Sequence, residues 1–72
     1  MYKNFKEDKF IEKLIFEKKK VKISLQEGFA YVGFVIGMSE NSILFKDKFE
    51  QEMMIFMKDI RRILVFNSEG EI

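Results

Sequence analysis

Lysine is the side chain through which this sequence is best equipped to recognise another molecule, and its lysines are unevenly distributed. Residues 1–22 carry eight lysines against four acidic residues, so their net charge is 8 − 4 = +4. Residues 23–72 carry five basic and eight acidic residues, so their net charge is 5 − 8 = −3. A basic segment on a mildly acidic body is one footprint of polyanion binding. The alternative is a solvated helix face with no binding role.

The residue types that catalysis and metal binding most often require are missing. The chain has no cysteine and no histidine, which excludes a disulfide framework, a thiolate metal site and the commonest general base. An enzyme built without these residues would need a carboxylate or lysine mechanism, and no paired-carboxylate motif is present. We therefore expect a protein that is not an enzyme and that binds no cofactor and no metal.

The length of 72 residues predicts a single small domain over residues 1–72. A domain of this size buries only about 60% of the surface that its unfolded chain exposes, and oligomerisation is a natural supplement to its stability. No apolar run approaches the ~20 residues of a transmembrane helix, and the N-terminus is too rich in lysines and acids for a signal peptide. We expect a soluble, cytoplasmic protein.

A helix is predicted over about residues 5–18. Asn4 followed by Glu7 resembles a capping box, and the lysines at 18–20 stand where cations favour a helix C-terminus. Between these signals, apolar residues recur with the spacing of one helix face. They are Phe10, Ile11, Leu14 and Ile15. Four acidic residues among the lysines favour packing against a core over binding to a membrane surface.

Five strands are predicted after the helix, within about residues 20–66, and residues 67–72 are predicted to be a frayed tail. The expected strand ranges are 20–26, 29–38, 42–46, 53–58 and 62–66. The first alternates strictly between apolar and polar residues, and Glu27-Gly28 supplies the turn that follows it. The run over 29–38 is apolar on both faces, so it must be covered on both sides. Gly33 inside this run indicates a sharp bend or a close backbone approach.

Short strands joined by tight turns describe a strongly bent sheet or a small barrel, and the sequence around them carries a family resemblance. The matching positions are Phe10-Ile11 and Leu14 in the helix, Val21-x-Ile23-x-Leu25, Gly28-Phe29-x-Tyr31-x-Gly33, Ile43-Leu44-Phe45-Lys46, and Ile55-Phe56 with Ile60. On these residues the chain resembles the Hfq proteins of the Sm-like (Sm/LSm) superfamily.

This resemblance implies a mainly β protein with an N-terminal helix and a five-stranded, strongly bent antiparallel sheet, the small open barrel of the Sm-like fold. It also implies a homo-oligomeric, hexameric ring in which the strand over 53–58 pairs with the strand over 62–66 of a neighbour. A ring would pair both exposed sheet edges, which otherwise invite aggregation. The implied function is that of an RNA chaperone and post-transcriptional regulator that binds single-stranded U-rich or A-rich RNA. No small-molecule substrate and no membrane are implied.

On the helix-bearing (proximal) face, the resemblance places RNA-binding positions at Asn41, Met57, Lys58 and Glu7. Asn41 stands where the family has an aromatic residue, so it can hydrogen-bond a base edge but cannot stack. Met57-Lys58 stands in place of a Lys-His pair. Loss of an aromatic platform typically costs ~1–3 kcal/mol per base. The alternative for Asn41 is that it serves only as a turn residue, a position that asparagine often occupies.

On the opposite (distal) face, the implied RNA-binding positions are Ser24, Phe29 and Tyr31. Ser24 replaces an aromatic residue and Val32 a glutamine, whereas Phe29 and Tyr31 replace aliphatic residues. The alternative for Phe29 and Tyr31 is packing in the core.

The family's arginine patch at the ring rim corresponds to Ile15-Phe16 and is lost. Lys18, Lys19 and Lys20 follow within a turn, and we expect them to act as phosphate contacts, because lysine releases counterions from nucleic acid. The missing Lys-His pair and the missing aromatic residue at Asn41 leave a second hypothesis open, that of an Sm-like protein-assembly module with degenerate RNA pockets.

Overall fold

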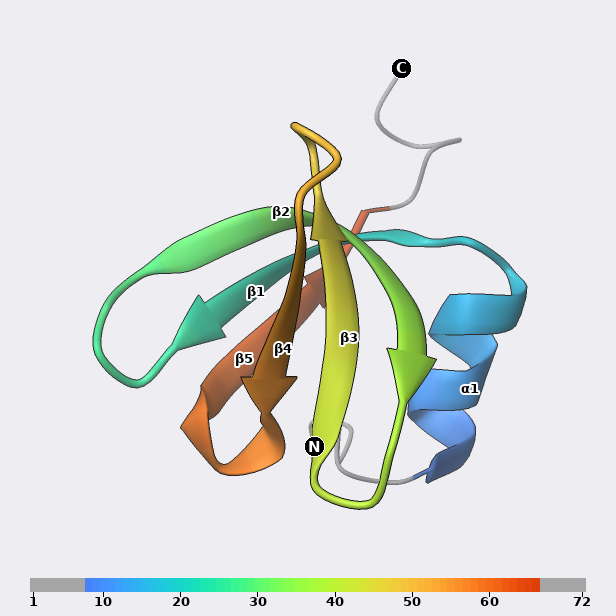
Figure 1. Ribbon diagram of the computed structural model, residues 1–72, viewed down its shortest axis with the longest axis horizontal. Coiled ribbons are helices and arrows are strands. Elements are labelled where there is room, and N and C mark those ends of the chain that lie inside the picture. Colours follow the sequence, from blue (N-terminus) through green and yellow to red (C-terminus); the bar gives the residue numbers. More distant parts are fainter. Residues whose placement is uncertain (1–7, 67–72) are drawn as a thin grey trace.

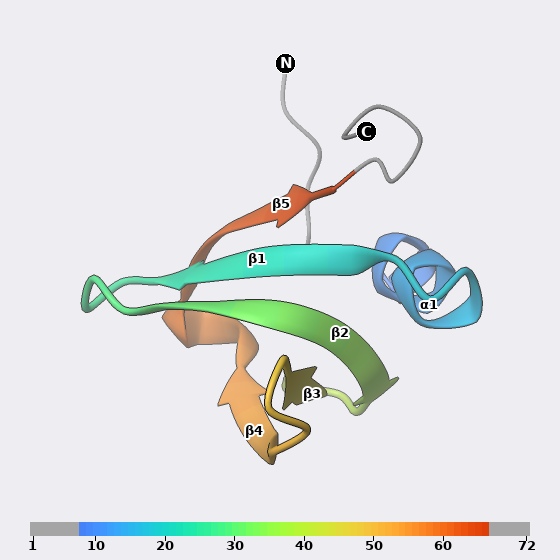
Figure 2. The same ribbon diagram turned by 90° about the horizontal axis from the view of Figure 1, so that it is seen from above.

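A computed structural model describes residues 8–66 as one helix and a five-stranded antiparallel sheet (Figure 1). The elements are α1 (Asp8–Phe16), β1 (Lys20–Leu25), β2 (Ala30–Met38), β3 (Ser42–Asp47), β4 (Glu52–Phe56), the 3₁₀ turn η1 (Met57–Asp59) and β5 (Ile60–Val65). The strands lie in the order β4-β3-β2-β1-β5. Seen from above, the sheet bends sharply and α1 lies beyond one end of it (Figure 2). The predicted mainly β class and element order are confirmed.

Helix α1 ends in a Schellman motif. The amide of Lys19 donates to the carbonyl of Leu14 at 3.1 Å, and the amide of Lys18 donates to that of Ile15 at 3.2 Å. Lys18 has a φ of 53°, the left-handed conformation that glycine usually adopts at this position. The helix therefore ends at Phe16 instead of near residue 18. The expected cap at Asn4 and Glu7 lies outside the described residues.

The turn between β1 and β2 depends on Gly28, whose φ is 107°. Its amide donates to the carbonyl of Leu25 at 2.9 Å, and the amide of Leu25 donates to the carbonyl of Phe29 at 2.8 Å. A residue with a β-carbon would be strained at this φ. The Glu27-Gly28 turn predicted from the sequence is therefore present.

Strand β2 bends at two places. At Gly33, an added β-carbon would overlap the carbonyl oxygen of Lys46 and lie 2.8 Å from the Cα of Asp47. This is the close backbone approach that the glycine indicated. Further along, the pairing with β3 shifts register between Val35 and Gly37, and such a bulge increases local twist and bending.

Two strand boundaries differ from the sequence prediction by two residues, and the others differ by at most one. The strand expected over 53–58 ends at Phe56, and Met57 and Lys58 belong to η1. The last strand begins at Ile60 instead of residue 62. The amide of Gln26 donates to the carbonyl of Asp59 at 2.9 Å, which ties η1 to the end of β1. The short connection thus joins β4 and β5, which lie at opposite edges of the sheet.

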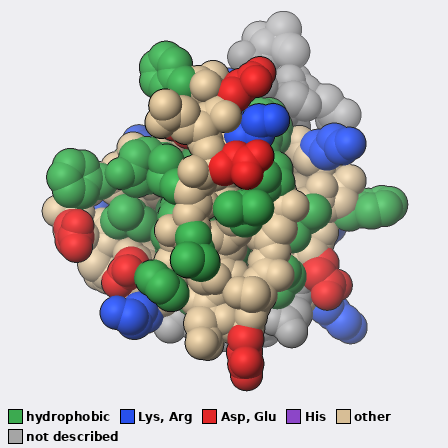
Figure 3. Space-filling model, in the orientation of Figure 1, with side chains coloured by type: hydrophobic (Ala, Val, Ile, Leu, Met, Phe, Trp, Pro, Cys, Tyr) green, Lys and Arg blue, Asp and Glu red, His purple; other side chains and the backbone are tan. Residues whose placement is uncertain are grey.

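The core lies inside the bend of the sheet, and α1 closes one end of it through Ile11 and Leu14. Its buried side chains are Ile11, Leu14, Val21, Ile23, Val35, Ile43, Phe45, Ile55, Met57 and Ile60. The opposite side of β2, β3 and β4 carries exposed apolar side chains, and Figure 3 shows hydrophobic side chains over the middle of this face with many charged ones near its margins. The outer side of β2, which the sequence analysis expected to be covered, is thus left uncovered within a single copy.

Candidate nucleic-acid interface

Three of the four proximal positions meet at one pocket. A cavity of about 470 Å³ is lined by Glu40, Asn41, Phe56, Met57 and Lys58. The amide of Met57 donates to the carbonyl of Asn41 at 2.8 Å, so the turn after β2 and the turn after β4 are fixed against each other. The fourth position, Glu7, lies outside the described residues.

The side chains in this pocket differ in what they offer a ligand. Asn41 and Lys58 are exposed, whereas Met57 belongs to the buried core. The Lys58 Nζ lies 3.8 Å from the Asp59 Oδ1, and both side chains are well exposed, so solvent screens this pair and leaves the lysine accessible to a phosphate. The pocket also contains the carboxylate of Glu40. It is therefore only weakly suited to an anion.

Phe56 is the aromatic residue of this pocket that the sequence analysis did not assign to a site. It is 45% exposed and lies across from Ser42 in the β3–β4 ladder, next to the Asn41 position. Strand alternation could have identified Phe56 as exposed from the sequence, because side chains point alternately to the two faces of a strand and its neighbours Ile55 and Met57 are buried. Phe56 gives the pocket a ring on which a base can stack.

The three distal positions do not form one surface. Ser24 pairs with Ala30 on β2 and with Arg62 on β5, on the outer face of the sheet. Tyr31 pairs with the buried Ile23 and packs against the core. Phe29 stands in the hairpin before β2 and is 61% exposed. The aromatic rings expected near Ser24 therefore lie elsewhere.

The outer face around Ser24 instead carries cations that the sequence analysis did not assign. Residues directly opposite in a ladder share a face, and Lys22 lies between Val32 on β2 and Leu64 on β5. Arg62 is the partner of Ser24. The alternation of β1 indicates from the sequence that Lys22 shares a face with Ser24. That Arg62 lies on the same face follows only from the register between β1 and β5, which are far apart in the sequence.

Aromatic rings flank the next cation of the same face. Lys20 lies opposite Phe34 on β2, and its Nζ lies 5.7 Å from the ring centroid of Phe66. Phe34 in turn lies opposite Lys46 on β3. Cations and aromatic rings thus alternate across the sheet, an arrangement that suits single-stranded nucleic acid because phosphates and bases alternate along its chain.

The lysine run expected to contact phosphates is divided among three surfaces. Lys18 lines a pocket between α1 and the sheet. Lys19 lines a pocket between α1 and β5, and its Nζ lies 3.7 Å from the Glu17 Oε1. Lys20 lies on the outer face of β1. The change from helix to strand in the middle of the run separates the three side chains.

Within residues 8–66, no three His, Cys, Asp or Glu side chains come together in a way that could hold a metal ion. Over the same part of the chain, no helix is long and apolar enough to cross a membrane.

The comparison with known proteins identifies the fold. No protein-family model and no curated protein matches the sequence. Among solved structures, the chain is similar to one described as the 1.55 Å crystal structure of the pleiotropic translational regulator Hfq, with a TM-score of 0.76 and 17% sequence identity. The match covers 81% of this chain and 95% of that one. The chain therefore has the fold of that protein, the Sm-like fold that the sequence predicted.

Proposed function

We propose that residues 1–72 form a single domain that assembles into a homo-oligomeric, hexameric ring and binds single-stranded RNA in the cytoplasm. Its role would be that of an RNA chaperone in post-transcriptional regulation, with no catalytic step. The similarity in fold to a translational regulator supports this proposal. So does the Hfq-like spacing of apolar residues and glycines in the sequence.

The two edges of the sheet support assembly into a ring. Strands β4 and β5 are both unpaired on their outer sides in a single copy, and an unpaired edge readily adds another strand. Both edges carry exposed apolar side chains, Met54 and Phe56 on β4 and Leu64 and Val65 on β5. Pairing β4 of one copy with β5 of the next is a heterologous contact, which repeats until the ring closes.

The single observation that carries RNA binding is the outer face of the sheet, where Lys20, Lys22 and Arg62 are interleaved with Phe34, Leu64 and Phe66. No acidic residue pairs with these three cations in the β1–β2 or β1–β5 ladder. A ring would repeat this arrangement in every subunit, so the field and the number of contacts would grow with the assembly. Asn41, Phe56 and Lys58 would form a second, weaker site on the other side.

The test combines a mass measurement with RNA titrations. Light scattering should give the mass of a closed ring. Labelled oligo-U and oligo-A, titrated at several salt concentrations, should bind with an affinity that falls steeply as salt rises. A monomer at all concentrations would contradict the ring, and a ring without RNA binding at low salt would contradict the RNA function.

A second candidate function is protein assembly without RNA. It is favoured by the pocket at Asn41, where the residue at the stacking position has no ring, Met57 is buried and Glu40 opposes an anion. A ring that fails to bind both oligonucleotides at low salt would support this candidate.

A further inference from the structure

The loop between β3 and β4 is rigidly built and presents an exposed aromatic ring. The Asp47 Oδ1 accepts hydrogen bonds from the amides of Phe49 at 2.8 Å and Gln51 at 2.9 Å. The amide of Glu50 donates to the Asp47 carbonyl at 2.9 Å, and the amide of Asp47 donates to the Gln51 carbonyl at 2.9 Å. Phe49, held at the tip by these bonds, is 74% exposed.

The charge around this ring is mainly negative. Residues 47–52 contain three acids, Asp47, Glu50 and Glu52, and one lysine, so their net charge is 1 − 3 = −2. Asp47 ends β3 and Glu52 begins β4, so Glu50 is the acid of the loop itself, and the Nζ of Lys48 lies 5.4 Å from the ring centroid of Phe49. The loop therefore presents an exposed aromatic anchor next to the carboxylate of Glu50, in a conformation held by hydrogen bonds.

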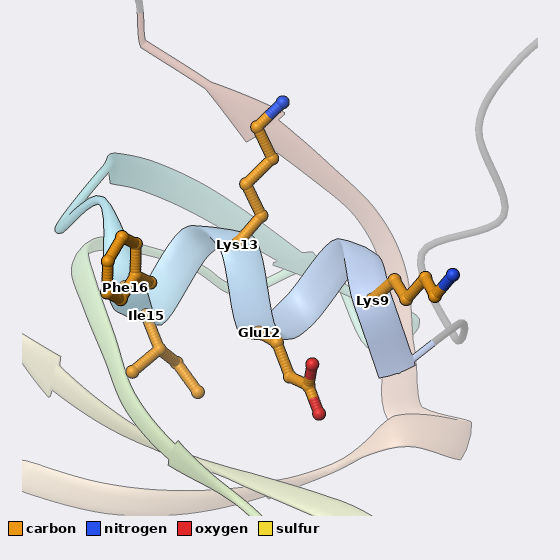
Figure 4. Close-up of a pocket in the computed structure, with 5 residues that line it drawn as sticks. All are labelled: Lys9, Glu12, Lys13, Ile15 and Phe16. Atoms are coloured by element: carbon orange, nitrogen blue, oxygen red, sulfur yellow. The ribbon is translucent and has the colours of Figure 1, made fainter.

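A pocket with the opposite character lies between the end of α1 and the bent part of the sheet. We call it the helix–sheet pocket. It has a volume of about 350 Å³ and is lined by Ile15, Lys18, Phe34, Val35, Ile36 and Lys46. Its walls are apolar and its charged groups are both ammonium groups. Ile15 also lines a neighbouring hollow along α1, where Figure 4 shows it pointing from the helix towards the sheet.

Neither lysine of the helix–sheet pocket forms an ion pair within residues 8–66, although Glu52 lies opposite Lys46 in the β3–β4 ladder. The ion pairs of this part of the chain are Lys19 with Glu17 and Lys58 with Asp59. Lys18 is held at the mouth of the pocket by the end of α1, where its φ is 53°, and Lys46 lies opposite Phe34 in the β2–β3 ladder. A segment of another molecule that carries both an apolar side chain and a carboxylate would fill the apolar part of the pocket and pair with its lysines.

We propose that the helix–sheet pocket binds the β3–β4 loop of a second copy of this chain. Phe49 would enter between Ile15, Phe34 and Ile36, and Glu50 would approach Lys18 and Lys46. Loop and pocket match in charge and in apolar character, and the loop pays little entropy on docking because it is preorganised. Figure 1 shows the loop at the top of the molecule and the C-terminal end of α1 at its right-hand side, and a reciprocal exchange of loops between two copies would relate them by a two-fold axis.

This contact goes beyond the proposed ring, because it uses neither edge of the sheet, although it shares Phe34 with the outer face proposed for RNA. It would join two rings, or two single copies, through the end of the molecule that carries the loop. Its test is therefore separable from the test of the ring.

Sedimentation velocity over a range of concentrations measures the association. We expect the wild-type protein to reach twice the mass of its basic unit, and Phe49→Ser to weaken this step by about ten- to a hundredfold, the effect of losing one buried aromatic anchor. Ile36→Ser should act similarly from the pocket side without changing any charge. Phe29→Ser, which removes a different exposed phenylalanine, is the matched control and should associate like the wild type.

Charge reversal tests the polar half of the contact. Glu50→Lys should weaken association about two- to fivefold, as expected for an exposed ion pair. Combining it with Lys46→Glu should restore part of the loss, because the pair is re-formed with opposite signs. Urea unfolding of each variant at one concentration verifies that the fold is retained.

A cross-linking experiment identifies the two surfaces directly, because the natural chain has no cysteine. Lys48→Cys places a thiol beside the loop tip, and Phe16→Cys places one at the 86% exposed position next to Ile15. When the Lys48→Cys and Phe16→Cys proteins are mixed and oxidised, the disulfide between the two variants should form in preference to a disulfide between two copies of either variant. Adding Ile36→Ser to the Phe16→Cys protein should abolish this mixed disulfide.

The proposal is overturned if the wild-type protein and Phe49→Ser have the same mass at every concentration, whether that mass is a monomer or a ring. It is also overturned if Ile36→Ser leaves association unchanged while lowering oligonucleotide affinity tenfold, since the pocket would then be a nucleotide site. A monomer that forms a dimer dependent on Phe49 would support this contact, and it would contradict only the proposed ring.

Discussion

The α-carbon of Gly33 on β2 lies so close to the backbone of Lys46 on β3 that no β-carbon fits between them. Strands β2 and β3 approach each other where β2 bends. The positions of Phe34 and Lys46, which belong to both the outer face and the helix–sheet pocket, depend on this approach. One glycine thus controls the shape of two candidate sites.

Gly33→Ala should therefore destabilise the protein by about 2–3 kcal/mol, because overpacking displaces the backbone of β3. Gly37→Ala is the matched control. An added β-carbon at Gly37 would lie 3.5 Å from the Cβ of Leu44, an ordinary contact, so this change should be neutral or stabilise the protein by up to about 1 kcal/mol. Urea unfolding at a fixed protein concentration measures both. Equal costs at the two glycines would show that the close approach at Gly33 has no energetic consequence.

Lys18→Gly should stabilise the protein by roughly 1 kcal/mol, because glycine adopts the left-handed conformation of the Schellman motif without the penalty that a β-carbon brings. Lys18→Ala removes the same charge but keeps the β-carbon, so it should show no gain. The midpoint of urea unfolding, at an unchanged slope, reports the difference. A gain shared by both variants would trace the effect to charge instead of to backbone conformation.

Replacing Lys22 and Arg62 together by glutamine should weaken binding of oligo-U and oligo-A alike. It should also lower the slope of log affinity against log salt by about 0.7 for each lost contact with a single strand. Both effects follow if these cations contact phosphates on the outer face. Lys13→Gln, which removes an exposed lysine from α1, is the control for net charge and should change neither. Fluorescence anisotropy at several salt concentrations provides the measurement, and an unchanged slope in the double variant would remove the outer face as the binding surface.

Asn41→Tyr should raise affinity for oligo-U by ~1–3 kcal/mol per stacked base, because it returns an aromatic platform to a pocket that already holds Phe56 and Lys58. Asn41→Leu, which is apolar but has no π face, should give no such gain. Oligo-A affinity should change less if it depends on the opposite face. A gain of the same size in Asn41→Leu would point to apolar contact instead of stacking.

Much of the fold is readable from local patterns. The alternation from Val21 to Leu25, the Glu27-Gly28 turn and the glycine at 33 each report a local requirement, and the structure satisfies all three. The predicted end of α1 lies about two residues beyond the observed one, because two backbone hydrogen bonds that composition does not reveal stabilise the left-handed conformation of Lys18. The last strands were misplaced because the burial of Met57, which turns the chain into η1, depends on the assembled core.

The candidate sites were less predictable for a related reason. Asn41 and Lys58 meet because β3 and β4 pair and a backbone hydrogen bond joins their turns. Ser24 gains Arg62 as a neighbour only through the β1–β5 register, which links distant parts of the chain. The sequence shows which residues alternate within one strand, but it does not show which strands lie next to one another.

The three residues of η1 connect the two edge strands of the sheet. In a closed ring, the angle between the edge that a subunit offers to one neighbour and the edge that it offers to the other determines how many copies complete the circle. That angle depends on the bend of the sheet from β4 through β3, β2 and β1 to β5, and η1 bridges its two ends. In such a ring, the bulge in β2 that bends the sheet would contribute to the number of subunits without contacting any neighbour.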